Sequence, residues 1–264
     1  MSPPPEVVVA SSARELADRT AARLVAALAT ALDSRAEAHW GLTGGGILES
    51  VFRAVKPLKD SVDWSRVHVW WGDERYVASD SDDRNDTAAF AALLDALPLA
   101  PERVHRMPAA DPGSPDVDVA AAAYAAELRA AIGPDDAAGG TGVPRFDVML
   151  LGVGPDGHCA SLFPGRPGVH ENRATVIGVR DSPKPPPLRL SLTFPALDAA
   201  AEIWFVASGQ AKAHAVAMAI SGADPAEVPS AGPRGRERTL WLIDRDAALE
   251  LPAAGQHAGR NSRA

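Results

Sequence analysis

One histidine stands out as a candidate for acid–base chemistry, because it follows a glycine-rich turn at the end of an apolar stretch. The segment GVGPDGH, residues 152–158, ends at His158. A lone histidine is most often structural, but flanking glycines at a predicted strand end favour a chemical role. Neutral imidazole titrates near neutral pH and suits general-base work. His158 is therefore the first candidate catalytic residue, and Asp156 is a candidate to orient it.

The same segment satisfies the G-x-G-x-x-G pattern of dinucleotide-binding loops. Pro155 inside the turn and the position in the middle of the chain both argue against a nicotinamide site. No strand–helix unit with an acidic residue about 20 positions later is evident either. We therefore expect no organic cofactor at this loop.

Cys159 is a second possible nucleophile beside His158. Consecutive side chains on a helix do not face each other, so a Cys–His pair fits poorly here. We interpret Cys159 as a small packing residue. The absence of G-x-S-x-G and H-E-x-x-H motifs argues against serine-hydrolase and zincin mechanisms.

Two further loops carry groups suited to anion binding. Thr43, Gly44 and Gly45 lie between a predicted strand and helix, where backbone N–H groups can bind an anion; the alternative is a plain tight turn. Asp73 and Arg75 belong to the loop GDER, residues 72–75. This loop is either a solvated salt-bridge cluster or a carboxylate beside an anion-binding arginine.

Two cations complete the candidate site. Arg189 follows a run of three prolines, and Lys212 follows Ser208-Gly209 at a predicted helix start. Each alone is most often a surface charge. Together with the glycine loop, they would form a cradle for a phosphate monoester.

The alternation of short β-rich runs with Ala-rich stretches predicts the elements that position these loops. Predicted strands cover residues 6–10, 38–42, 67–71, 146–153, 176–179, 188–192, 203–207 and 240–243. Predicted helices cover residues 12–32, 47–55, 87–97, 117–132, 210–220 and 244–249. This order predicts a three-layer α/β/α fold with a mostly parallel, open, Rossmann-like sheet. Ligands of such sheets bind beyond the carboxyl ends of the strands.

We expect one domain over residues 1–251 and a flexible tail over residues 252–264, because the apolar periodicity is lost there. A net charge of -8 and a pI near 5.4 argue against a nucleic-acid partner. No apolar run is long enough to cross a membrane, and the N-terminus does not have the pattern of a signal peptide. A single cysteine gives no sign of an oxidising compartment. We expect a cytoplasmic monomer.

These motifs jointly resemble the glucosamine-6-phosphate isomerase/6-phosphogluconolactonase family, and within it the lactonases. The matching segments, in the family's order, are LTGG at 42–45, WGDERYV at 71–77, SDDRN at 81–85, LLG at 150–152, HCASLFPG at 158–165, PPLRLSLT at 186–193 and SGQAK at 208–212. The segment SDDRN departs from the family's usual Ser-Asn pattern. The resemblance covers about residues 6 to 250.

The resemblance implies hydrolysis of 6-phospho-D-glucono-1,5-lactone to 6-phosphogluconate, without a metal or organic cofactor. His158 matches the family's general base, Arg189 and Lys212 match phosphate-binding positions, and Arg75 matches a substrate-contacting arginine. The matching of Asp73 to a catalytic role is weaker.

One position separates two activities within the family. The deaminases of the family place a glutamate five residues after the histidine, and this chain has Phe163 there. Since a phenyl ring cannot transfer a proton, Phe163 favours the lactonase over an amino-sugar isomerase or deaminase. A sugar-phosphate sensor without turnover is a third hypothesis, disfavoured because only about five residues precede the first predicted strand.

Overall fold

A parallel β-sheet forms the centre of the protein. The computed structural model describes residues 3–133 and 142–252, and within them seven parallel strands pair in the order β1-β10-β9-β6-β2-β3-β5. The strands are β1 (Glu6–Ala10), β2 (Ala38–Leu42), β3 (Val67–Trp71), β5 (Val104–His105), β6 (Val148–Gly152), β9 (Glu202–Ala207) and β10 (Arg238–Asp244). The predicted mostly parallel sheet is confirmed.

A second, smaller sheet was not anticipated. It joins β4 (Asp73–Arg75), β8 (Arg189–Leu192) and β7 (Val176–Val179) in antiparallel pairs. The sequence predicts β7 and β8 as strands but gives no sign that they leave the main sheet. β4 directly follows β3, so this small sheet extends from the edge at which the main strands end.

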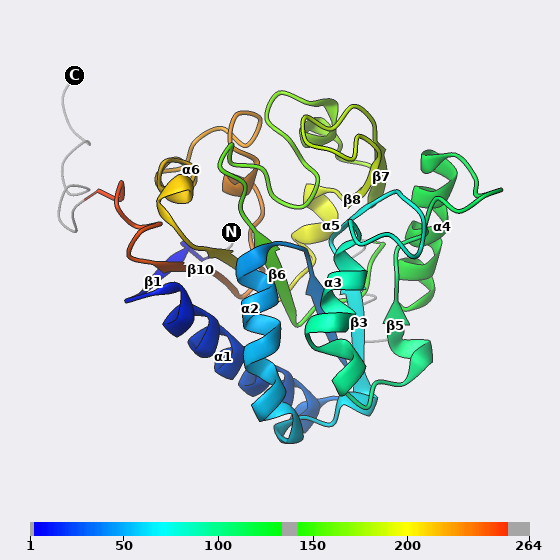
Figure 1. Ribbon diagram of the computed structural model, residues 1–264, viewed down its shortest axis with the longest axis horizontal. Coiled ribbons are helices and arrows are strands. Elements are labelled where there is room, and N and C mark those ends of the chain that lie inside the picture. The colour runs from blue at the N-terminus through cyan, green and yellow to red at the C-terminus, as the bar shows by residue number, and fades with distance from the viewer. Residues whose placement is uncertain (1–2, 134–141, 253–264) are drawn as a thin grey trace.

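Helices cover both faces of the main sheet (Figure 1). They are α1 (Ala13–Ser34), α2 (Gly46–Val55), α3 (Asn85–Ala92), α4 (Val117–Ala130), α5 (Phe194–Leu197) and α6 (Ala213–Ile220). Alternate side chains of a strand point to opposite faces. On one face Trp40 packs edge-on against Phe52 of α2. On the other, Trp70 packs edge-on against Tyr124 of α4. The predicted three-layer arrangement is confirmed.

Three predicted helices differ from the structure. Of the helix predicted over residues 244–249, residues 245–249 form turns, because Asp244 ends β10 and its carboxylate accepts the N–H groups of Gly209 and Ala247. The helix predicted over residues 87–97 begins earlier and breaks after Ala92 into a short 3₁₀ turn. Lys212 lies in a 3₁₀ turn that precedes α6.

None of the helices in the described part of the chain is both long enough and apolar enough to span a membrane. Of the predicted tail over residues 252–264, the structure describes only Pro252. Most of the loop between Gly133 and Pro144 also lies outside the described residues. The boundaries of the domain therefore stay a prediction.

Candidate active site

The predicted site residues meet at one cavity. It has a volume of about 560 Å³ and lies where β2, β6 and β9 end, as the rule for open parallel sheets requires. All the predicted residues except Asp156 line it: Thr43, Gly44, Gly45, Asp73, Arg75, His158, Arg189 and Lys212. Asp156 contacts the cavity through His158.

A tight turn after β6 places His158 in the cavity. Gly154 N–H donates to the His158 carbonyl at 2.9 Å, and Gly157 adopts a positive φ of 82° that favours glycine. A Cβ on Gly154 would overlap the His158 ring and the Asp156 carboxylate. The glycines of this turn therefore make room for the histidine, which is a structural reason for the G-x-G-x-x-G pattern.

The hydrogen bonds of His158 determine which ring nitrogen is free. His158 Nδ1 lies 2.5 Å from Asp156 Oδ1, a distance that two lone pairs would not tolerate, so Nδ1 carries a proton and donates it. Lys184 Nζ lies 3.1 Å from the same oxygen and 3.1 Å from Nδ1. Since Lys184 and the Nδ1–H group are both donors, the carboxylate is their shared acceptor. In neutral His158 the lone pair is then on Nε2.

Asp156 stays ionised in this arrangement. Burial opposes the charge, but the hydrogen bonds and ion pairs with His158 and Lys184 outweigh it and hold the Asp156 pKa below its ordinary value. The ionised carboxylate fixes the tautomer of His158 and stabilises the imidazolium that would form on protonation.

Phe163 and Cys159 are buried apolar residues next to the site. The Phe163 ring is buried, lies 4.8 Å from the His158 ring, and has the Arg189 guanidinium 5.9 Å above it. Cys159 is fully buried, and burial followed by the nearby charge of Asp73 raises the pKa of its thiol. A buried thiol with a raised pKa is a poor nucleophile. The interpretation of Cys159 as a packing residue is consistent with this environment.

Two arginines lie side by side across the small sheet. Arg75 of β4 and Arg189 of β8 are register partners. Arg189 donates through Nε and one terminal nitrogen to three carbonyl groups of residues 184–186, so it also holds the loop that carries Lys184. Burial and then the neighbouring Arg75 lower the Arg189 pKa, although Asp73 opposes this. Within the described residues, Arg75 Nε is buried and has no hydrogen-bond partner.

The two acidic residues of this loop are buried, and Asp73, whose catalytic role stays a prediction, lines the cavity. Asp73 accepts a hydrogen bond from Ser161 Oγ at 2.8 Å. Glu74 is fully buried and accepts the backbone N–H groups of Arg75, Asn85 and Asp86. Burial, followed by the charge of Asp86, raises the pKa of Glu74 to about 7. A solvated salt-bridge cluster, one of the two interpretations of the sequence, is therefore wrong, because both carboxylates are buried and Glu74 accepts the backbone N–H of Arg75.

The glycine loop presents backbone groups to the cavity. Thr43 Oγ1 accepts from Gly152 N–H at 3.0 Å and lies 3.3 Å from the Leu150 carbonyl, so this side chain joins β2 to β6. Gly45 has a φ of 131°, which favours glycine, and it caps the ten-residue helix α2. Backbone N–H groups at the start of a helix of this length are able to bind an anion.

Lys212 supplies a further cation to the cavity. Asp244 anchors its loop by accepting hydrogen bonds from Ser208 Oγ and Gly209 N–H. Within the described residues Lys212 Nζ makes no hydrogen bond or ion pair of its own. Burial and then the charge of Lys184 lower the Lys212 pKa. A half-buried ammonium without a protein partner is suited to an anionic ligand.

The sequence reasoning missed three residues of the site: Lys184, Asn85 and Ser161. Lys184 lies directly before the proline run that drew attention to Arg189, so its position next to a candidate residue was the available signal. Asn85 Nδ2 donates to the Asp73 carbonyl at 2.9 Å and lines the cavity. Asn85 and Ser161 lie in the matching segments SDDRN and HCASLFPG, which were the available signal for them.

Comparison with known proteins decides the family. A family model described as glucosamine-6-phosphate isomerases/6-phosphogluconolactonase matches residues 11–241. The chain belongs to this family. A Streptomyces coelicolor protein named 6-phosphogluconolactonase is 52% identical over 257 residues, which cover 96% of this chain and 97% of that protein. The predicted membership of this family and its resemblance to the lactonases are confirmed.

Solved structures of the family share the fold. The structure of 6-phosphogluconolactonase from Trypanosoma brucei matches with a TM-score of 0.78 and 25% identity, and covers 96% of this chain and 100% of its own. A monomeric glucosamine-6-phosphate deaminase matches with a TM-score of 0.73 at 20% identity, covering 92% of this chain and 99% of its own. At 20% identity, the similarity to the deaminase shows only that the two proteins share a fold.

The burial of Cys159 predicts its reactivity. We expect the native protein to react with a thiol reagent such as DTNB only as fast as it unfolds, because the thiol is inaccessible and its pKa is raised. Raising the pH from 7 to 9 should therefore increase the native rate far less than that of a free cysteine. Protein in denaturant is the control and should react at once. Rapid stoichiometric labelling of the folded protein would contradict the described environment.

Proposed function

We propose that this protein is a 6-phosphogluconolactonase that hydrolyses 6-phospho-D-glucono-1,5-lactone to 6-phospho-D-gluconate, with His158 as general base. The observation that carries the proposal is the Nδ1–H donation of His158 to Asp156, inside a cavity lined by Arg75, Arg189 and Lys212. The proposal also rests on relatives that carry this name.

The phosphate of the substrate binds at the cationic wall. Lys212 and Arg189 supply an ammonium and a guanidinium, and the N–H groups of Gly45 and the first turn of α2 supply backbone donors. Two nitrogens of Arg189 donate hydrogen bonds to backbone carbonyls. The remaining terminal nitrogen is therefore the group available to a ligand. Binding the phosphate fixes the sugar ring relative to His158.

His158 then activates water. Its Nε2 lone pair takes a proton from a water molecule as the water oxygen attacks the carbonyl carbon of the lactone. Asp156 stabilises the resulting imidazolium, and Lys184 keeps Asp156 in place. The negative charge that develops on the carbonyl oxygen is stabilised by nearby donors, among which Arg75 is the candidate.

Ring opening completes the reaction. The tetrahedral intermediate collapses, the bond between the carbonyl carbon and the ring oxygen breaks, and the imidazolium returns its proton to that oxygen. One water is consumed, and the product carboxylic acid loses a proton to solvent. Every step uses a single titrating base, so the proposed reaction needs neither a metal nor an organic cofactor.

Phe163 argues against the deaminase activity of the family. Opening an amino-sugar ring and isomerising it needs a second proton-transferring group. The position five residues after His158 is a buried phenyl ring that packs against the imidazole. A single base packed against a phenyl ring suits ester hydrolysis. The cytoplasmic location, the monomeric state and the lack of a nucleic-acid or membrane partner stay predictions.

Replacing the base tests the mechanism. We expect His158→Ala and His158→Gln to lower kcat on fresh 6-phosphogluconolactone by about 10²- to 10⁴-fold, the usual contribution of general-base catalysis. The assay is acid release in a pH-stat, corrected for spontaneous hydrolysis. Glucosamine 6-phosphate is offered in parallel, and ammonia release from it would support the deaminase instead. Full lactonase activity in a folded His158 variant would refute the assigned base, and binding without turnover by the wild type would indicate a sensor.

Replacing the ammonium tests the phosphate cradle. We expect Lys212→Ala to lower kcat/KM for the phosphorylated lactone by about 10- to 100-fold, because a hydrogen bond to a charged group is worth about 1.5–3 kcal/mol. Activity on unphosphorylated gluconolactone should change little. Lys59→Ala, which removes an exposed lysine from a distant 3₁₀ turn, is the matched control. Equal losses on both lactones would place the phosphate elsewhere.

A further inference from the structure

An ammonium group lies directly beside the imidazole of the candidate base. Lys184 Nζ is 3.1 Å from His158 Nδ1 and 3.1 Å from Asp156 Oδ1, the oxygen that also accepts the Nδ1–H of His158. The proposed mechanism gives Lys184 only the task of keeping Asp156 in place. A cation this close to the ring also acts on the ring itself, because it changes how readily His158 binds a proton.

The loop that carries Lys184 is closed by its own hydrogen bonds. Ser182 Oγ donates to the Lys184 carbonyl at 2.8 Å, and Ser182 N–H donates to the Pro187 carbonyl at 3.0 Å. Arg189 donates a further hydrogen bond to the Lys184 carbonyl at 3.1 Å. The side chain of Lys184 lines the cavity. Since these contacts fix the backbone of the loop, the ammonium is in place without the help of a substrate.

A contribution to stability does not account for this ammonium. The side chains of Lys184 and Asp156 are 37% and 33% exposed. An ion pair as exposed as this one contributes little to the free energy of unfolding, because water screens it. The feature that distinguishes this pair from other surface pairs is its direct contact with His158 inside the cavity.

The carboxylate and the ammonium act on His158 in opposite directions. Ionised Asp156 favours the imidazolium, because opposite charges attract, and by itself it would hold the proton on the ring to higher pH. An imidazolium cannot take a proton from water. The ammonium of Lys184 disfavours the imidazolium, because like charges repel. With both groups present, Asp156 orients the ring without trapping it in the protonated form.

We propose, as an extension of the function proposed above, that Lys184 is a positioning residue that offsets the charge of Asp156 and so keeps His158 available as a free base. The same repulsion assists the second half of the reaction. Once Nε2 has taken a proton from water, the imidazolium lies beside an ammonium and returns that proton to the ring oxygen more readily. The proton taken up is the one given back, so this step needs no further donor.

The other charged side chains that line the cavity are Asp73, Arg75, Arg189 and Lys212. In the part of the chain that the structure describes, none of them shares a hydrogen bond or an ion pair with His158. These four side chains are the same in every Lys184 variant. A difference between those variants therefore reports the charge at Lys184.

The pH dependence of lactone hydrolysis tests this role. We expect Lys184→Met to move the acid-side midpoint of kcat/KM upward by about one pH unit, because the charge of Asp156 then acts on His158 unopposed. One pH unit below the wild-type midpoint, this shift lowers activity about 10-fold, whereas activity well above both midpoints should change little. Lys184→Arg keeps the charge and should restore the wild-type profile. Lys59→Met, at an exposed lysine in a distant 3₁₀ turn, is the matched control.

Proton NMR of the ligand-free protein follows His158 without any turnover. The Cε1–H signal of His158 is assigned by its loss in His158→Gln. We expect it to titrate about one pH unit higher in Lys184→Met than in the wild type and in Lys184→Arg. This measurement separates the two proposals. A shifted titration in a protein without lactonase activity would refute the proposed function and still support the charge pairing.

Two results would overturn the role of Lys184. An equal loss of activity at every pH, with an unchanged titration of His158, would show that the lysine only supports the structure. A higher KM for the phosphorylated lactone alone, with both midpoints unchanged, would make Lys184 a phosphate ligand instead. Lys184→Gln is a second neutral variant, which keeps the test valid if Lys184→Met fails to fold.

Discussion

The chemistry of the cavity depends on one hydrogen bond, the 2.5 Å contact between His158 Nδ1 and Asp156. It places the proton on Nδ1, so the lone pair of the neutral ring is on Nε2. Lys184 binds the same carboxylate oxygen and helps to keep Asp156 ionised. The contact is possible only because Gly154 has no side chain where the imidazole lies. The turn, the base and the charge beside it therefore form one structural unit.

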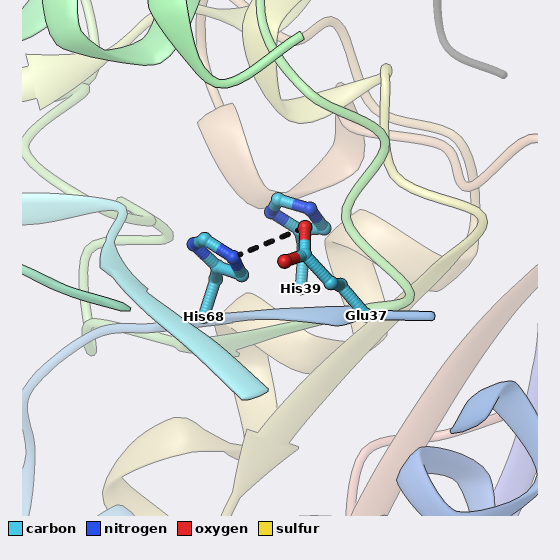
Figure 2. Close-up of side chains that lie close together, drawn as sticks. All are labelled: Glu37, His39 and His68. Atoms are coloured by element: carbon cyan, nitrogen blue, oxygen red, sulfur yellow. Dashed lines mark ion pairs between the residues drawn. The ribbon is translucent and has the colours of Figure 1, made fainter. Parts of the chain in front are cut away.

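The parallel sheet places that unit next to its partners. β2, β6 and β9 are neighbours, and all three end at the cavity, so loops distant in the sequence meet there. The antiparallel sheet adds Arg75 and Arg189 as adjacent cations, which a buried Glu74 and the carbonyls of residues 184–186 hold in place. The opposite end of the same two strands carries His39 and His68, which are register partners (Figure 2).

Much of this arrangement could be predicted from the sequence. β2 and β3 were predicted with their observed bounds, because their apolar runs are short and bordered by polar loops. His158 and the glycine loop were found because ligand groups of a parallel sheet follow the strand ends, a rule that depends only on element order.

The features that the sequence does not predict depend on contacts between segments that are distant in the sequence. β4 has three charged residues, and nothing local predicts that Asp73–Arg75 pairs with β8. Lys184 was missed because its role comes from reaching Asp156, 28 positions away in the sequence. Residues 244–249 have a helical pattern, yet Asp244 ends a strand and anchors the Lys212 loop instead. In each case a tertiary contact outweighed the local pattern.

A crystal structure with bound 6-phosphogluconate tests the central claim most directly. The account predicts that the phosphate lies against Lys212, Arg189 and the first turn of α2, with the carboxylate of the product within hydrogen-bond reach of His158 Nε2. A phosphate bound away from Lys212 and Arg189, or a product carboxylate that lies far from His158, would contradict it.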